Sequence, residues 1–158
     1  MTGPHRIAGF QGKHRFLSNF WPAVVWFEGA QYPSVEVAYQ SAKCAQPEDR
    51  SGFIGLSPGE AKRYGRKIKI RADWDTVKLD TMLGLLRQKF SPGHEELREQ
   101  LLNTGDAELV EENTWGDRFW GVCGGSGTNH LGRLLMQVRD EIRSWRESFP
   151  LDTPDGKA

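Results

Sequence analysis

The sequence has few cysteines, no long apolar run and no excess of charge of either sign. Its 158 residues include only two cysteines, Cys44 and Cys123, which are too few for a disulfide framework. The N-terminal stretch lacks the apolar segment of a signal peptide, and nothing approaches the roughly 20 consecutive apolar residues of a membrane span. We therefore expect a cytoplasmic protein in a reducing setting, with no membrane contact.

The 21 Lys and Arg residues balance the 21 Asp and Glu residues, so the formal net charge is zero. No global field attracts the molecule to nucleic acid or to an anionic membrane, and any such contact must use a local patch. One candidate is the segment 62–71, in which six of ten residues are Lys or Arg. This segment could hold a pyrophosphate or a nucleic-acid backbone, or it could be a solvated surface helix and strand.

Several common catalytic and metal-binding patterns are also missing. Residues 124–127 read Gly-Gly-Ser-Gly, but the spacing of neither common phosphate-binding loop is met, so we expect a flexible turn there. The four histidines lack zinc-ligand spacing, and no G-x-S-x-G nucleophile elbow occurs. We expect neither a metal nor a cofactor.

A chain of 158 residues fits one compact domain, and the pattern predicts the mainly α (α+β) class with a small β element. Residues 23–27 (Ala-Val-Val-Trp-Phe) predict a strand, and the glycine at position 29 predicts a hairpin. A second short strand is expected near residues 109–111. We place the domain at residues 1–148 and expect the tail 149–158, which has two prolines and a glycine, to be disordered.

Helical periodicity dominates the rest of the chain. A helix is predicted after the start signal Pro33-Ser34, and a shorter one over residues 61–65 after a capping-box pattern. Apolar spacing predicts further helices over residues 79–90 and 97–101. The last helix is the clearest, with a stripe that we expect to face the core: Leu131, Leu135, Val138, Ile142 and Trp145. Aromatic residues gather early and late in the sequence, which suggests that the two ends meet in space.

Polar residues on the first predicted helix form one candidate site. Glu36, Gln40 and Lys43 stand at i, i+4 and i+7, so their side chains project from one face. They could line one pocket together. A solvated face with a charge pair is the competing interpretation, and the spacing alone favours it.

The segment 114–121 (Thr-Trp-Gly-Asp-Arg-Phe-Trp-Gly) forms a second candidate site. Its aromatic rings give flat stacking surfaces beside a carboxylate, a composition suited to binding a ring or a base. Buried tryptophans with a satisfied aspartate cap are the competing interpretation. The acidic residues just before it, Glu108, Glu111 and Glu112, have a surface position as their simplest interpretation.

Four segments carry motifs that together are far more specific than any one alone. They are residues 16–20 (FLSNF), 32–43 (YPSVEVAYQSAK), 115–121 (WGDRFWG) and 127–136 (GTNHLGRLLM). In this order they closely resemble the NADAR family, also called YbiA-like, from about Arg6 to Arg143. The resemblance implies a YbiA-like, mainly helical fold and an N-glycosidase, a hydrolase that cuts the bond between ribose C1 and an amine nitrogen. One departure stands at positions 37 and 38, where the family often has His and an aromatic residue but this chain has Val and Ala.

The resemblance also implies the class of substrate. Family members act on ADP-ribose attached to guanine of nucleic acid, or on phosphoribosylamino-pyrimidine intermediates of riboflavin synthesis. We place ADP-ribosylated guanine in nucleic acid first because of the basic segment 62–71, although zero net charge weakens that preference. Such an enzyme would counteract a separately encoded ADP-ribosyltransferase toxin. A non-catalytic binder of ADP-ribose or NAD is the alternative from another class.

Catalytic roles follow from the same resemblance. Lys43 is expected to attack C1, displace the base and leave a Schiff base that water hydrolyses. Its amine must then be partly neutral, which requires a pKa below the ordinary lysine value. Glu36 is expected to shuttle protons, and Asp117 to act on the ribose hydroxyls or the attacking water. A two-carboxylate mechanism without a covalent lysine is the rival.

The substrate-binding residues are carried over from the same motifs. By family analogy, two asparagines orient the substrate and two tryptophans stack on it or form a wall of the site. The full expected set is Asn19, Phe20, Gln40, Trp115, Gly116, Trp120 and Asn129.

Overall fold

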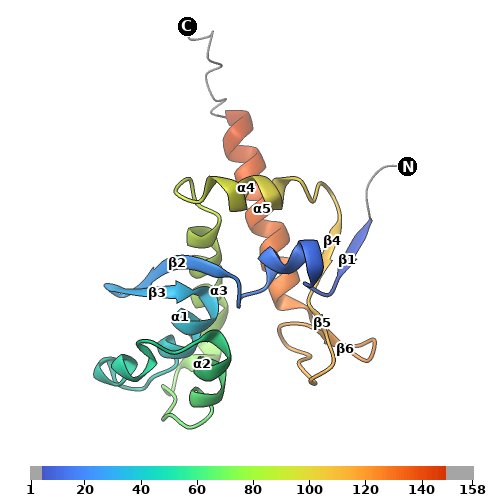
Figure 1. Ribbon diagram of the computed structural model, residues 1–158. Coiled ribbons are helices and arrows are strands. Elements are labelled where there is room, and N and C mark those ends of the chain that lie inside the picture. Colours follow the sequence, from blue (N-terminus) through green and yellow to red (C-terminus); the bar gives the residue numbers. More distant parts are fainter. Residues whose placement is uncertain (1–4, 149–158) are drawn as a thin grey trace, which may run out of the picture.

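The computed structural model describes residues 5–148, so the predicted tail at 149–158 lies outside the described residues. The described part is mainly helical, with short strands paired two by two, which confirms the expected class. In Figure 1 the long helix α5 (His130–Ser148) runs through the molecule between two groups of elements. The hairpin β2–β3 and helices α1 and α2 lie on one side of α5, and strands β1, β4, β5 and β6 lie on the other.

A hairpin and the helix that follows it build the first group. β2 (Pro22–Phe27) and β3 (Ala30–Ser34) pair antiparallel, which confirms the predicted hairpin. α1 (Val35–Ala42) begins where predicted, because the hydroxyl of Ser34 accepts a hydrogen bond from the Val37 N–H at 3.2 Å. Every residue of α1 is buried, so the solvated-face interpretation of this helix is wrong.

Two further helices pack around α1. α2 (Pro58–Tyr64) begins with the predicted capping box, in which Ser57 and Glu60 bond each other's backbone N–H groups. α3 (Trp74–Lys89) contacts α1, β2 and α5 and therefore connects the hairpin to the last helix. These contacts fix α1 in the middle of the molecule.

The remaining helices are short. α4 (Glu95–Leu102) packs on α5 and is followed by Gly105, whose φ of 64° permits a turn after the helix. Two 3-10 helices, η1 (Gly12–Leu17) and η2 (Pro47–Phe53), were not predicted. Such short helices leave too few turns for a periodic apolar signal.

The second group joins an early segment of the chain to later ones. β1 (Arg6–Ala8) pairs in parallel with β4 (Glu108–Val110), close to the strand predicted near 109–111. β5 (Glu112–Asn113) pairs in parallel with β6 (Val122–Cys123). The expectation that early and late segments meet is confirmed.

The core confirms most of the predicted stripe on α5. Leu131, Leu135, Val138 and Ile142 are buried. The expectation that Trp145 also faces the core is wrong, because it is 46% exposed where α5 extends past the body of the molecule (Figure 1). No helix within residues 5–148 is long and apolar enough to cross a membrane.

Candidate active site

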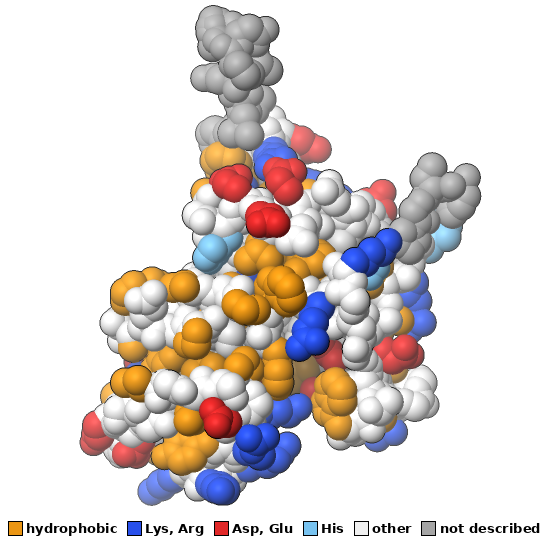
Figure 2. Space-filling view, viewed as in Figure 1, with side chains coloured by type: hydrophobic (Ala, Val, Ile, Leu, Met, Phe, Trp, Pro, Cys, Tyr) orange, Lys and Arg blue, Asp and Glu red, His pale blue; other side chains and the backbone are white. Residues whose placement is uncertain are grey.

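A cavity of about 780 Å³ opens between α1 and the loops that follow β4. Its size falls within the range of sites for small-molecule ligands and cofactors. In Figure 2, Lys and Arg side chains gather on the lower part of the visible face, where α2 lies in Figure 1, beside a hollow. Nine of the ten residues expected at the site line the cavity: Asn19, Phe20, Glu36, Gln40, Lys43, Trp115, Gly116, Asp117 and Trp120.

α1 forms one wall and presents the polar face predicted from its spacing. Glu36 accepts a hydrogen bond from Gln40 Nε2 at Oε2, 2.7 Å away. Lys43 follows the last turn of α1, and its Nζ lies 5.4 Å from the centroid of the Tyr39 ring. The cavity therefore receives a carboxyl, an amide and an amine from α1 and the residue that follows it.

Burial pushes the two charged groups of this wall toward their neutral forms. It lowers the pKa of Lys43, and the nearby cations Lys78, Arg66 and Lys62 add to the effect while Glu36 opposes it. Burial likewise raises the pKa of Glu36, against the Gln40 hydrogen bond and the lysine charges. Both shifts bring the pKa values of these two groups closer together.

The segment 18–20 extends the α1 wall. Its backbone is tied to α1 because the Glu36 N–H donates to the carbonyl of Asn19 at 3.0 Å. The Asn19 side chain donates to the sulfur of Met82 at 3.5 Å, but its Oδ1 is buried and has no hydrogen-bond partner within residues 5–148. This acceptor is therefore available to a substrate hydroxyl or amine.

Lys89, a residue that was not predicted at the site, binds the backbone of the same segment. It lies at the end of α3, is fully buried, and donates to the carbonyl of Ser18 at 2.8 Å. Burial lowers the pKa of Lys89 to about 7. The periodicity of α3 contained a signal, since Met82, Leu86 and Lys89 follow helical spacing along one face.

The opposite wall is irregular and is held by side chains. Asn113 Oδ1 accepts hydrogen bonds from the N–H groups of Trp115 and Asp117, at 3.2 and 3.1 Å. Asp117 Oδ1 in turn accepts from the N–H groups of Phe119 and Trp120, at 3.1 and 2.8 Å. These bonds fix the backbone of the loop, and they also fix the orientation of the Asp117 carboxylate at the edge of the cavity.

Asn129, the tenth expected residue, does not line the cavity. Its Nδ2 donates to the carbonyl of Leu109 at 2.9 Å, and its Oδ1 accepts from the Glu111 N–H at 2.9 Å. Both polar groups of the amide are thus bonded to the backbone. Asn129 therefore positions the end of β4, and its contact with a substrate stays a prediction.

The two tryptophans occupy different environments. Trp120 connects the walls, since its Nε1 donates to the hydroxyl of Tyr39 at 3.1 Å. Trp115 is 58% exposed, with Lys62 Nζ 5.0 Å from the centroid of its ring. The interpretation of buried tryptophans is therefore wrong for Trp115, which is free to stack on a ligand. Gly116 beside it has a φ of 88°, which permits the sharp turn of the loop.

Besides Lys43, three basic side chains line the cavity: Arg15 of η1, Lys62 of α2 and Arg66, which follows α2. The last two belong to the predicted basic segment, whereas Arg15 of η1 was missed. Another member of the segment, Arg71, lies outside the cavity and pairs with Asp73 at 2.6 Å. Only part of the basic segment therefore faces the site.

Two of the acidic residues interpreted as surface also line the cavity, Glu111 and Glu112. Glu111 is partly buried, so the surface interpretation is wrong for this residue. Glu108 is exposed as expected. Within residues 5–148, no group of three His, Cys, Asp or Glu side chains is arranged to hold a metal ion.

Comparison with known proteins identifies the family of this chain. The family model of the NADAR domain matches residues 9–143. The chain belongs to the NADAR family. It is 41% identical over 137 residues to an N-glycosidase of Nostoc punctiforme, with 81% of this chain and 85% of that protein covered. It is 37% identical over 134 residues to a riboflavin biosynthesis protein of Vibrio vulnificus, with 82% of this chain but 36% of that protein covered.

A solved NADAR relative confirms the fold. The NMR structure of the Escherichia coli protein YbiA matches with a TM-score of 0.81 at 32% identity, and the match covers 98% of this chain and 93% of that one. The expected YbiA-like fold is therefore confirmed. The names of the relatives confirm the expected class of enzyme, an N-glycosidase.

Proposed function

We propose that this N-glycosidase hydrolyses the bond between ribose C1 and an amine nitrogen through a Schiff base on Lys43. One observation carries the proposal: the Lys43 amine lines the cavity, and burial together with three nearby cations lowers its pKa. An amine can attack carbon only in its neutral form. The site thus favours the reactive state of this lysine.

Glu36 is the partner of Lys43 in this scheme. As the amine bonds to C1, the bond from C1 to the base nitrogen breaks, and the base leaves with that electron pair and is protonated as it departs. The lysine nitrogen loses a proton, which the Glu36 carboxylate on the same wall takes up. The sugar ring then opens, its oxygen receives the proton, and C1 remains joined to Lys43 as a Schiff base. Water adds to C1 and releases both the sugar aldehyde and the lysine. Asp117 would bind a ribose hydroxyl or orient this water.

We propose ADP-ribose on guanine of nucleic acid as the substrate. A cavity of about 780 Å³ has room for an extended ligand, and Arg15, Lys62 and Arg66 could pair with its pyrophosphate. The exposed ring of Trp115 offers a surface on which a base could stack. Such an activity would reverse the product of a separately encoded ADP-ribosyltransferase toxin.

A phosphoribosylamino-pyrimidine is the second candidate substrate. It is favoured by the similarity to the Vibrio vulnificus protein named for riboflavin biosynthesis. Arg15, Lys62 and Arg66 could pair with its single phosphate. Because both substrates contain the same ribose-to-amine bond, the chemistry at Lys43 would be unchanged.

The test is to incubate the protein separately with ADP-ribosylated guanine DNA and with a phosphoribosylamino-pyrimidine, and to measure released base by chromatography. We expect release from the guanine substrate, and loss of at least about a thousandfold in rate for Lys43→Ala. The matched control is Lys13→Ala, an exposed lysine outside the cavity. Binding of ADP-ribose without release of base would contradict the proposal and favour a non-catalytic binder.

A further inference from the structure

The backbone of Glu111 is held more firmly than that of an ordinary loop residue. It follows the end of β4, where its N–H donates to Asn129 Oδ1 at 2.9 Å. Its carbonyl accepts hydrogen bonds from the Val122 N–H at 2.9 Å and from Asn113 Nδ2 at 3.3 Å. Three hydrogen bonds therefore hold the main chain at Glu111.

The side chain of Glu111 has a defined course into the cavity. A methyl group added to Gly121 would come within 2.8 Å of Cγ of Glu111 and would collide with its carbonyl oxygen. Glycine at position 121 thus leaves the space through which the side chain passes. The carboxyl group lines the cavity, and no hydrogen bond or ion pair to it is found in the part of the chain that the structure describes.

Three other carboxyl groups line the cavity and differ from Glu111: Glu112 is exposed, whereas Asp117 and Glu36 are already hydrogen-bonded. Asp117 Oδ1 is bonded to two backbone N–H groups, and Glu36 Oε2 is bonded to the Gln40 amide. Burial raises the pKa of Glu111 to about 7, helped by the negative charges of Asp117 and Glu36 and opposed by Lys62. Near neutral pH, Glu111 therefore exchanges between its protonated and ionised forms, and within residues 5–148 its carboxyl has no hydrogen-bond partner.

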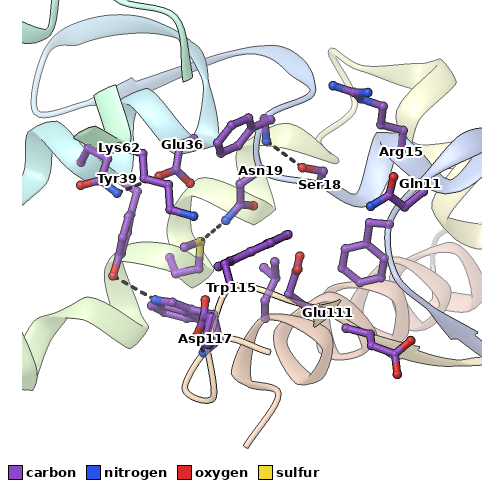
Figure 3. A pocket seen from close by; sticks show the side chains of 18 of the residues that line it. Gln11, Arg15, Ser18, Asn19, Glu36, Tyr39, Lys62, Glu111, Trp115 and Asp117 are labelled. Carbon is purple, nitrogen blue, oxygen red and sulfur yellow. Dashed lines mark hydrogen bonds between the residues drawn. The ribbon is translucent and has the colours of Figure 1, made fainter. Parts of the chain in front are cut away.

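Glu111 also lies on the correct side of the site. Figure 3 shows Glu36 of α1 and Glu111 on opposite sides of the cavity, with Asn19 and Trp115 between them. When an amine attacks a carbon atom from one wall, the departing nitrogen leaves toward the other wall. A departing amine nitrogen needs a proton, because its anion is a poor leaving group.

We propose that Glu111 is a further catalytic residue, the general acid that protonates the departing nitrogen. This inference rests on the proposed function. As Lys43 Nζ bonds to C1, the C1–N bond breaks, its electron pair stays on the nitrogen, and that nitrogen takes the proton of Glu111. The Glu111 carboxylate then removes a proton from the water that adds to the Schiff base, which restores its starting state. Glu36 keeps the separate task of moving the lysine proton to the ring oxygen.

A series of leaving groups tests this role. Phosphoribosyl arylamines with electron-rich and electron-poor rings would be given to the wild-type protein and to Glu111→Gln, Glu111→Asp and Glu108→Gln. Glu108 is the matched control, an exposed glutamate at the start of β4. For electron-rich amines we expect Glu111→Gln to lower kcat by about 100-fold or more, and Glu111→Asp to fall in between. For the most electron-poor amine, which leaves without protonation, the loss should be less than about tenfold.

The pH profile gives a second measurement. Wild-type kcat should fall on the alkaline side as Glu111 loses its proton, and that fall should disappear in Glu111→Gln. An equal loss for every leaving group, no loss at all, or an unchanged alkaline limb would overturn the role of Glu111. Failure of the wild-type protein to cleave any of the substrates would instead overturn the proposed function, so the two failures are distinguishable.

Discussion

The two walls of the cavity present their polar groups in opposite ways. On α1 the backbone satisfies its own hydrogen bonds, so Glu36 and Lys43 are free to face the ligand. On the opposite wall the backbone is irregular, and it is held by hydrogen bonds from the side chains of Asn113, Asp117 and Asn129. On an irregular wall many polar side chains are therefore needed to hold the backbone, and few remain for chemistry, among them Glu111 and the Asp117 carboxylate that line the cavity.

The largest effect should come from breaking the framework of the irregular wall. Asn129→Ala removes the partners of the Glu111 N–H and of the Leu109 carbonyl, both of which lie beneath the loop. It also places alanine at a φ of 59°, which asparagine tolerates better. We expect the free energy of unfolding to fall by about 2–5 kcal/mol, together with a loss of kcat, as measured by urea unfolding and base release.

The control for this variant is Asn103→Ala, because Asn103 is exposed at the end of α4. Its free energy of unfolding should change by less than about 0.5 kcal/mol. An Asn129→Ala protein that is as stable as this control but fails to bind substrate would contradict the framework role and restore Asn129 as a ligand contact.

A smaller effect is expected where the irregular wall does present a side chain to the ligand. Trp115→Ala should raise KM by about 5–100-fold, because base stacking on an aromatic ring is lost. Its stability should hardly change, since Trp115 is 58% exposed. Steady-state kinetics and thermal melting would measure the two quantities.

Trp26→Ala provides the comparison for Trp115, since Trp26 is 52% exposed on the hairpin and does not line the cavity. It should leave KM unchanged. If Trp115→Ala leaves KM unchanged as well, the ring is a surface feature and not part of the binding site.

The smallest effect concerns the second buried lysine behind the α1 wall. Burial lowers the pKa of Lys89 to about 7, so the folded chain holds it neutral between that pH and the unfolded lysine value of about 10.4. In this window the unfolded chain binds more protons, so Lys89 makes the free energy of unfolding rise with pH, by up to about 1.4 kcal/mol per unit. Below the window both states are protonated, so Lys89 no longer makes the free energy of unfolding depend on pH.

Lys89→Met removes this titration and keeps an unbranched side chain in the core. The difference in free energy of unfolding between wild type and Lys89→Met should therefore shift in favour of wild type as pH rises through the window. Lys13→Met, at an exposed lysine, should run parallel to wild type. A parallel curve for Lys89→Met would show that Lys89 keeps its proton in the folded chain.

The same contrast explains how much of the site could be predicted from the sequence. The helical wall could be predicted because Ser34 marks its start and its polar residues repeat at helical spacing. The course of the backbone in the irregular wall could not be predicted. It depends on side-chain hydrogen bonds between residues that no periodicity relates. The motif indicates Asn129 and Asp117 as ligand contacts, and their additional hydrogen bonds to the backbone appear only once the loop is folded.

The fold shows a similar division. The hairpin, α1, α2 and α5 follow local signals of turn, cap and apolar stripe. The parallel pairing of β1 with β4 joins segments about a hundred residues apart, and three-residue strands carry no local signal of their partner. That pairing matters for function, since Glu111 follows directly after β4.

The most direct test of the account is reduction of the working enzyme with borohydride. The protein would be incubated with ADP-ribosylated guanine DNA, reduced, and examined by intact and peptide mass spectrometry. The account predicts a covalent sugar adduct on the peptide that carries Lys43, absent from Lys43→Ala and present in Lys13→Ala. Release of base by the wild-type protein without any adduct at Lys43 would contradict the Schiff-base mechanism and favour hydrolysis by the carboxyl groups alone.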